Sequence, residues 1–165
     1  MENEMLGHHH HDEKKAALFI IGLIVCQFSA YANAACPLEL EVSTGSAGRT
    51  TLDVRFALTY HGKKPIEIRE SDLPSGALSM QVFQNDEKKT EVRRLGYISD
   101  PGPDRINLIP GHTYRGQINI IGRFYNIENI IKKNGVTVRW SYTLTPIHGS
   151  PLPTVNGVFV INRQQ

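Results

Sequence analysis

The chain has 165 residues, a formal net charge of +2 and 40% apolar side chains. This length allows one domain, and the basic residues come as separate pairs at expected turns, such as Lys63-Lys64 and Lys132-Lys133. A nucleic-acid surface needs its cations gathered on one face with aromatic residues between them, so the sequence argues against nucleic acid as a partner.

An apolar run over residues 16–30 follows Lys14-Lys15 and precedes the small-residue pattern Ala32-Asn33-Ala34. This is the pattern of a secretory signal. We expect a signal helix in residues 1–34, cleavage after Ala34, and a domain over 35–165 that is secreted or periplasmic. The alternative is a retained membrane helix, which needs roughly 20 apolar residues. The mature chain then keeps 16 basic and 12 acidic side chains, a formal net charge of +4.

Four histidines, His8 to His11, lie in the leader. Neutral imidazoles bind metals, but we interpret this run as a leader feature or an expression remnant outside the mature fold. Cys26 also lies in the leader, so Cys36 is the sole cysteine of the mature chain and no internal disulfide forms. Cys36 is interpreted as a free or intermolecularly paired thiol. The alternative is a lipid attached as in bacterial lipoproteins, although Asn33 stands where such signals carry Leu, Val or Ile.

Apolar residues at every second position predict strands along the rest of the chain. The pattern is strongest in Val136, Val138, Trp140, Tyr142 and Leu144, and it makes Trp140 the expected centre of a β core. The expected strands cover residues 38–43, 52–60, 66–68, 90–95, 106–108, 114–121, 136–144 and 155–161, with another beginning at residue 78. Turn-rich loops separate them, including 71–76 and the charged tip 85–89.

Helix competes with strand only at residues 124–133, where Phe124, Ile127, Ile130 and Ile131 share a face at helical spacing. We expect one or two turns there, ended by Asn134-Gly135. Seven or more short strands with no second helix indicate an all-β fold, an immunoglobulin-like two-sheet antiparallel sandwich. Tyr114, Trp140 and Tyr142 are interpreted as core and edge packing, with a ligand pocket as the alternative.

The histidines of the mature chain, His61, His112 and His148, each stand alone in a turn or loop. Nucleophilic catalysis needs a serine or cysteine held by a histidine and an acid, and a zinc site needs three or four converging ligands. The sequence contains no such constellation, so we expect neither an enzyme nor a cofactor. Asp100 and Asp104 bracket the loop Pro101-Gly102-Pro103, where they stabilise turns or, alternatively, bind calcium.

Three features over residues 82–142 carry a resemblance to a known family. They are Gly96-Tyr97-Ile98 after a charged hairpin, the turn Leu108-x-Pro110-Gly111, and the pair Phe124-Tyr125 before Gly135, Val136 and Val138. The run resembles the immunoglobulin-like, non-catalytic N-terminal domain of deuterolysin-type lysine-specific metalloendopeptidases. The chain has no His-Glu-x-x-His pair, so the resemblance implies the fold and a role in contacting proteins, and no peptidase activity.

We therefore expect a module of the cell envelope or extracellular space that binds an unknown protein partner. The expected partner-binding surface combines Ser99, Asp100 and Asp104 with Phe124 and Tyr125, because loops cluster at the ends of sandwiches and exposed aromatic residues anchor partners. Two alternatives remain open. One is a protease inhibitor, and the other is a structural envelope protein whose only membrane contact, beyond its signal, is a lipid on Cys36.

Overall fold

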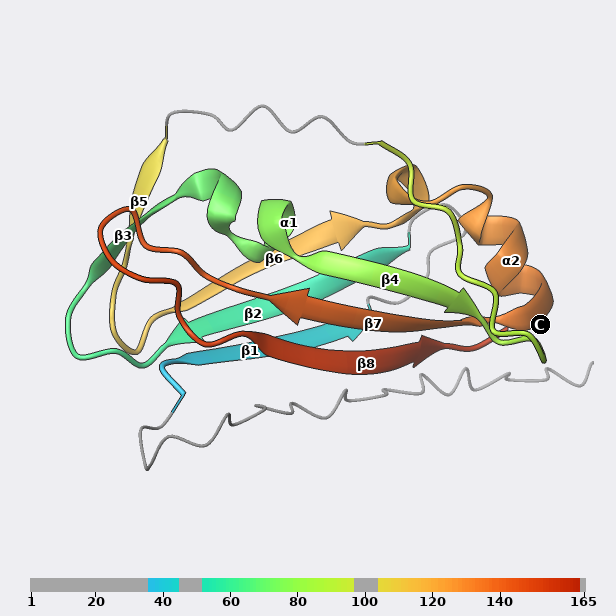
Figure 1. Ribbon diagram of the computed structural model, residues 1–165, viewed down its shortest axis with the longest axis horizontal. Helices are drawn as coiled ribbons and strands as arrows, with labels where there is room; N and C mark the ends of the chain where they lie inside the picture. Colours follow the sequence, from blue (N-terminus) through green and yellow to red (C-terminus); the bar gives the residue numbers. More distant parts are fainter. Residues whose placement is uncertain (1–35, 45–51, 97–103, 164–165) are drawn as a thin grey trace, which may run out of the picture.

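The computed structural model describes residues 36–44, 52–96 and 104–163 (Figure 1). The elements in chain order are β1 Leu38–Thr44, β2 Asp53–Tyr60, β3 Ile66–Arg69, η1 Glu70–Asp72, α1 Pro74–Ala77, β4 Ser79–Gln84, β5 Arg105–Leu108, β6 Thr113–Asn119, η2 Ile121–Arg123, α2 Ile127–Asn134, β7 Val136–Tyr142 and β8 Val155–Ile161. Every ladder is antiparallel, and the helices are short. The all-β sandwich expected from the sequence is confirmed.

Two three-stranded sheets form the layers of the sandwich, with strand orders β1-β2-β6 and β4-β7-β8. The chain therefore places its first two strands in one sheet, crosses to β4, returns to β6 beside β2, and finishes with β7 and β8. Immunoglobulin sandwiches distribute their strands A, B and E against C, F and G in this way. The strands β3 and β5 form a separate ladder at one end of the molecule, whereas α2 lies at the other end (Figure 1).

The alternating apolar residues of both sheets meet between the layers. On β7, the four residues at alternate positions, Val136, Val138, Trp140 and Tyr142, are all buried. Trp140 is only 5% exposed, which confirms its expected place in the core. Tyr142 is buried too, whereas Tyr114 is half-buried and its hydroxyl donates to the carbonyl of Asn107 at 2.7 Å. Packing of these inward faces is what holds a small sandwich together.

The segment over residues 90–95 corrects one expectation, because it makes isolated bridges in place of a full strand. Its first half pairs with β4, where the amide of Val92 donates to the carbonyl of Val82 at 2.7 Å. Its second half turns to another partner, and Arg94 bridges Phe124. The segment thus connects two elements and continues neither ladder. Val92 is buried.

The helices also depart from expectation. The short α1, which has Pro74 in its first turn, and η1 occupy the region expected to be a loop. The competing helix exists as α2, but it starts at Ile127 and leaves Phe124 in an extended conformation before it. Gly135 ends α2 as predicted, with a positive φ of 70° that favours glycine. Within residues 36–44, 52–96 and 104–163, no helix is long and apolar enough to cross a membrane.

Candidate protein-binding surface

Tyr125 is the most exposed large apolar side chain among the described residues, with 63% of its surface accessible. Its neighbour Phe124 is 2% exposed and belongs to the core. The two side chains point to opposite sides because the backbone is extended at Phe124, where φ is −133° and ψ is 139°. Phe124 was expected at the surface beside Tyr125, and that expectation is wrong.

The backbone that carries Tyr125 is held from the side by residues 93–95. The amide of Tyr125 donates to the carbonyl of Arg93 at 2.9 Å, and the amide of Leu95 donates to the carbonyl of Arg123 at 2.8 Å. Phe124, buried between these two bonds, fixes the segment to the core. Tyr125 therefore projects from a backbone that both hydrogen bonds and packing hold in place.

The start of α2 adds a polar border to Tyr125. Asn126 adopts a left-handed conformation with φ of 54°, and its side-chain oxygen accepts a hydrogen bond from Asn129 Nδ2 at 2.6 Å. Asparagine tolerates this conformation better than most residues. A shallow hollow of about 410 Å³ lies beside Tyr125, and Asn126, Asn129, Ile130 and Lys133 line it together with Gln84 and Asn134. We call Tyr125, Asn126, Asn129, Ile130 and Lys133 the Tyr125 surface.

The other residues expected at the binding surface lie elsewhere. Asp104 is exposed immediately before β5, and its carbonyl accepts a hydrogen bond from the amide of Glu70 at 2.9 Å. This places it at the β3–β5 end of the molecule, away from α2 and the Tyr125 surface (Figure 1). One surface that combines Asp104 with Tyr125 is therefore not formed. Ser99 and Asp100 lie outside the described residues.

Cys36 is half-buried just before β1, and its side chain packs against the core as a free thiol.

Two of the histidines, His61 and His148, each lie near a carboxylate. His61 Nε2 lies 2.9 Å from Glu39 Oε2, and both side chains are about half exposed. His148 Nε2 lies 3.8 Å from Glu67 Oε2. Where the structure describes the chain, no three His, Cys, Asp or Glu side chains gather as metal ligands. Residues 1–34, which include the expected signal peptide and His8 to His11, lie outside the described residues. Asp100, which the alternative calcium site would need beside Asp104, lies outside them too.

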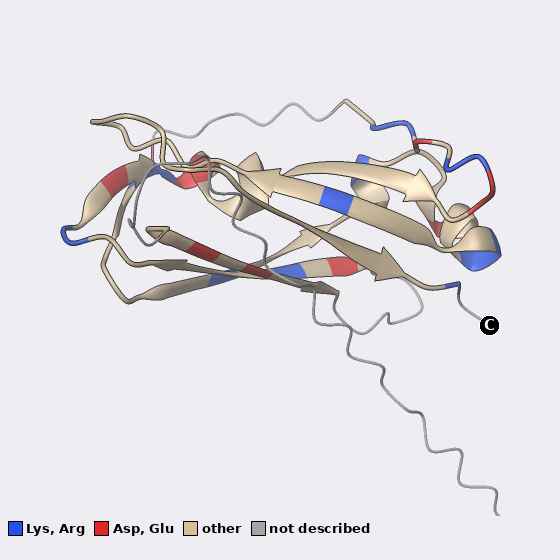
Figure 2. Cartoon of the chain, turned by 60° about the horizontal axis from the view of Figure 1, so that its bottom comes forward, with Lys and Arg blue, Asp and Glu red and all other residues tan. Residues whose placement is uncertain are grey.

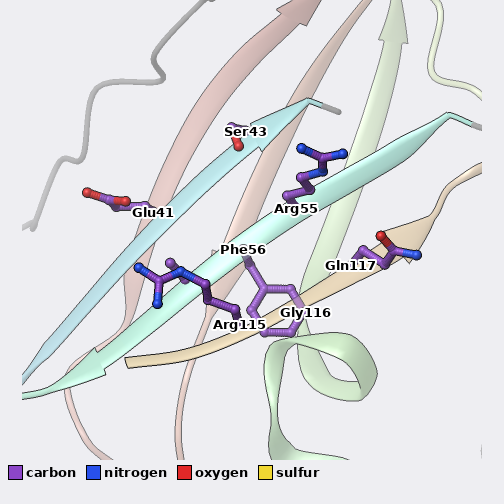
Figure 3. Close-up of a pocket in the computed structure, with 8 residues that line it drawn as sticks. Glu41, Ser43, Arg55, Phe56, Arg115, Gly116 and Gln117 are labelled. Carbon is purple, nitrogen blue, oxygen red and sulfur yellow. The ribbon is translucent and has the colours of Figure 1, made fainter. Parts of the chain in front are cut away.

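A second shallow hollow, of about 570 Å³, lies on the outer face of the β1-β2-β6 sheet. Glu41, Arg55, Ala57 and Arg115 are among the residues that line it. In Figure 3 the side chains of Arg55 and Arg115 point in different directions, and Glu41 points away from Arg55. The two arginines therefore do not converge on one position in this hollow.

Sequence reasoning found Tyr125 but missed the asparagines and the lysine beside it. The sequence signal was the spacing of Asn126 and Asn129, since a polar residue three positions before another at a helix start suggests a local hydrogen bond. No protein-family model matches the chain, and a comparison with curated proteins finds no match. Its function is therefore inferred from its own surface.

Proposed function

We propose that this chain is an exported, non-enzymatic module that binds another protein of the cell envelope or extracellular space through the Tyr125 surface. The observation that carries the proposal is the 63% exposure of Tyr125 next to the buried Phe124. A monomeric domain gains nothing in stability from an aromatic ring left in water, whereas tyrosine is enriched among the residues that dominate binding energy at protein interfaces.

The held backbone makes Tyr125 a suitable anchor. Binding costs free energy whenever a loop or side chain has to be ordered, and a tyrosine side chain has only two rotatable bonds. The hydrogen bonds of Tyr125 and Leu95 to residues 93 and 123 have already ordered the backbone. The polar groups of Asn126 and Asn129 border the ring, as the rim of an interface borders its apolar centre.

The test is affinity capture from envelope extracts, followed by quantitative mass spectrometry, with the native protein and with Tyr125→Ala. We expect the variant to lose a specific captured protein while its melting temperature stays unchanged, because the ring supports no core packing. Val158→Ala is the matched control, since Val158 is 49% exposed on β8 and its loss leaves capture intact. An identical captured set for native protein and Tyr125→Ala refutes the proposal.

A separate assay addresses the absence of catalysis. If the purified protein hydrolyses peptides, esters or glycans, and His61→Ala, His112→Ala or His148→Ala abolishes that activity, the non-enzymatic proposal fails. A protease among the captured proteins, together with inhibition of that protease, would identify the inhibitor alternative.

Export is part of the proposal, and its support is the apolar run and small-residue pattern that precede Ala35. Cys36 is partly buried and packs against the core, which supports an unmodified thiol over a lipid anchor. Intact-mass spectrometry of the exported protein tests both points. We expect a chain that begins at Ala35 without added lipid, and the mass of a lipidated cysteine would replace this account with a tethered one.

The resemblance to the non-catalytic domain of deuterolysin-type metalloendopeptidases also belongs to the proposal. Its support is the order of strands in the two sheets, which is the order of an immunoglobulin sandwich. A shared fold does not establish a shared function, so the binding role rests on Tyr125.

A further inference from the structure

Three basic pairs that are distant in sequence come together at one end of the molecule. They are Lys88-Lys89 in the hairpin after β4, Arg93-Arg94 in the segment after it, and Lys132-Lys133 in the last turn of α2. Figure 1 shows the chain that follows β4 at the same end of the molecule as α2, and the connection from β2 to β3, which carries Lys63-Lys64, at the opposite end; Figure 2 shows Lys and Arg segments in blue at both ends. The sequence suggested scattered charges, but the fold gathers them.

Hydrogen bonds explain how the three pairs meet. The amide of Asn85 donates to the carbonyl of Gly135 at 3.2 Å, which sets the hairpin beside the end of α2. The carbonyl of Arg93 accepts the amide of Tyr125, which sets the second pair beside the start of α2. The cations therefore border the Tyr125 surface, to which Lys133 itself contributes.

These six side chains are all exposed, and none of them forms an ion pair with another described residue. Residues 84–95 and 123–135 together carry seven Lys or Arg and four Asp or Glu side chains, a formal net charge of +3. The mature chain as a whole has +4, so most of its excess positive charge lies at this end. The dipole of α2 accounts for a cation in its last turn but not for the other two pairs.

We propose that the partner bound by the Tyr125 surface is an acidic protein. Its carboxylates face the three basic pairs, and Tyr125 inserts into the partner's surface between those carboxylates. Charge complementarity of this kind speeds encounter and selects partners. This inference deepens the proposed function and rests on it, because it names the chemistry of the partner. A polynucleotide fits less well, since Tyr125 is a single exposed ring where stacked bases need several.

The probe is fluorescently labelled poly-L-glutamate of about 20 residues, and binding to the full chain is measured by anisotropy at low salt. We expect Lys132→Glu/Lys133→Glu to weaken binding roughly tenfold, and added salt to weaken it for the native protein. Lys63→Glu/Lys64→Glu is the matched control, because it changes the net charge equally at the opposite end. The affinity of this control variant for poly-L-glutamate is expected to stay within about twofold of that of the native protein.

Arg93→Glu/Arg94→Glu repeats the test away from the helix end, in case glutamates in the last turn of α2 destabilise the helix. Equal weakening by the control pair and the test pairs would mean general attraction by net charge, and it would overturn the proposal. Tighter binding to a DNA oligonucleotide of equal charge, or to vesicles containing an anionic lipid, would also overturn it. If poly-L-glutamate fails to bind while capture still depends on Tyr125, the proposed function stands and only the acidic character of the partner is refuted.

Discussion

Trp140 lies directly across from Gly157 on the neighbouring strand, and its indole occupies the space where a side chain of Gly157 would lie. A Cβ atom added to Gly157 would be 2.6 Å from Cζ2 of Trp140. Phe56 and Gly116 repeat the arrangement in the other sheet, where the added Cβ would be 2.4 Å from Cζ of Phe56. Each sheet thus packs a large ring onto a glycine, whose missing side chain leaves room for the ring against the neighbouring strand.

This contact predicts that Gly157→Ala lowers the free energy of unfolding by about 1–3 kcal/mol, because the new methyl group forces the indole out of its packed position. Urea denaturation followed by tryptophan fluorescence measures it. Gly122→Ala is the control, since an added Cβ there meets nothing within 4 Å, and we expect a change within about 0.5 kcal/mol. Equal effects of the two substitutions would show that the indole moves freely.

The adjacent residues Phe124 and Tyr125 are expected to respond in opposite ways to truncation. Phe124→Ala removes a ring that is 2% exposed, and we expect a loss of about 3–5 kcal/mol of stability. Tyr125→Ala removes an exposed ring and is expected to change stability by less than about 0.5 kcal/mol. Thermal and urea unfolding of both variants make the comparison. A large loss for Tyr125→Ala would assign this residue to packing and weaken its proposed role as an anchor.

Tyr142 links β7 to η1, because its hydroxyl donates a hydrogen bond to the carbonyl of Asp72 at 2.7 Å. Burial raises the pKa of the Tyr142 phenol, and the negative charge of Asp72 raises it further. In the unfolded chain this pKa is about 10. Above that pH the unfolded state loses the proton while the folded state keeps it, so the free energy of unfolding decreases as pH rises.

We therefore expect Tyr142→Phe to cost about 1 kcal/mol at neutral pH, from the lost hydrogen bond, and to reduce the decline in stability above about pH 10. Urea denaturation at neutral and alkaline pH provides the measurement. Tyr125→Phe, at an exposed position, serves as the control and should leave the alkaline decline unchanged. A decline of the same slope in Tyr142→Phe and in the native protein would contradict this role of Tyr142.

Gly135 and Gly111 illustrate two structural reasons for a glycine, which are a positive φ and a lack of space for a side chain. Both have positive φ, 70° and 79°, but an added Cβ at Gly135 would lie 2.7 Å from the carbonyl oxygen of Ile161, whereas at Gly111 it meets nothing within 4 Å. Gly111→Ala is expected to cost on the order of 1 kcal/mol from backbone strain alone. Gly135→Ala is expected to cost clearly more in the same unfolding measurement, because the end of β8 has to move as well.

The alternation of apolar residues was sufficient to predict most strands and the burial of Trp140. A strand shows one face to the core whatever its neighbours are, so a period of two is readable without knowing the partner strand. The end of α2 at Gly135 was readable for a similar reason, because a positive φ at the residue that ends a helix is a local requirement that favours glycine.

The candidate surface depended on contacts between residues far apart in the chain. Phe124 and Tyr125 are both aromatic and adjacent, and only the pairing of this segment with residues 93–95 decides which ring is buried and which is exposed. The basic pairs carry no signal of proximity in the sequence, because each lies in its own turn or helix end. The sequence by itself determined most of the strands, the centre of the core and the end of α2, since these follow from local periodicity and backbone preference. The tertiary structure alone decided which side chains share a surface, since that depends on how the crossing segments hydrogen-bond and pack.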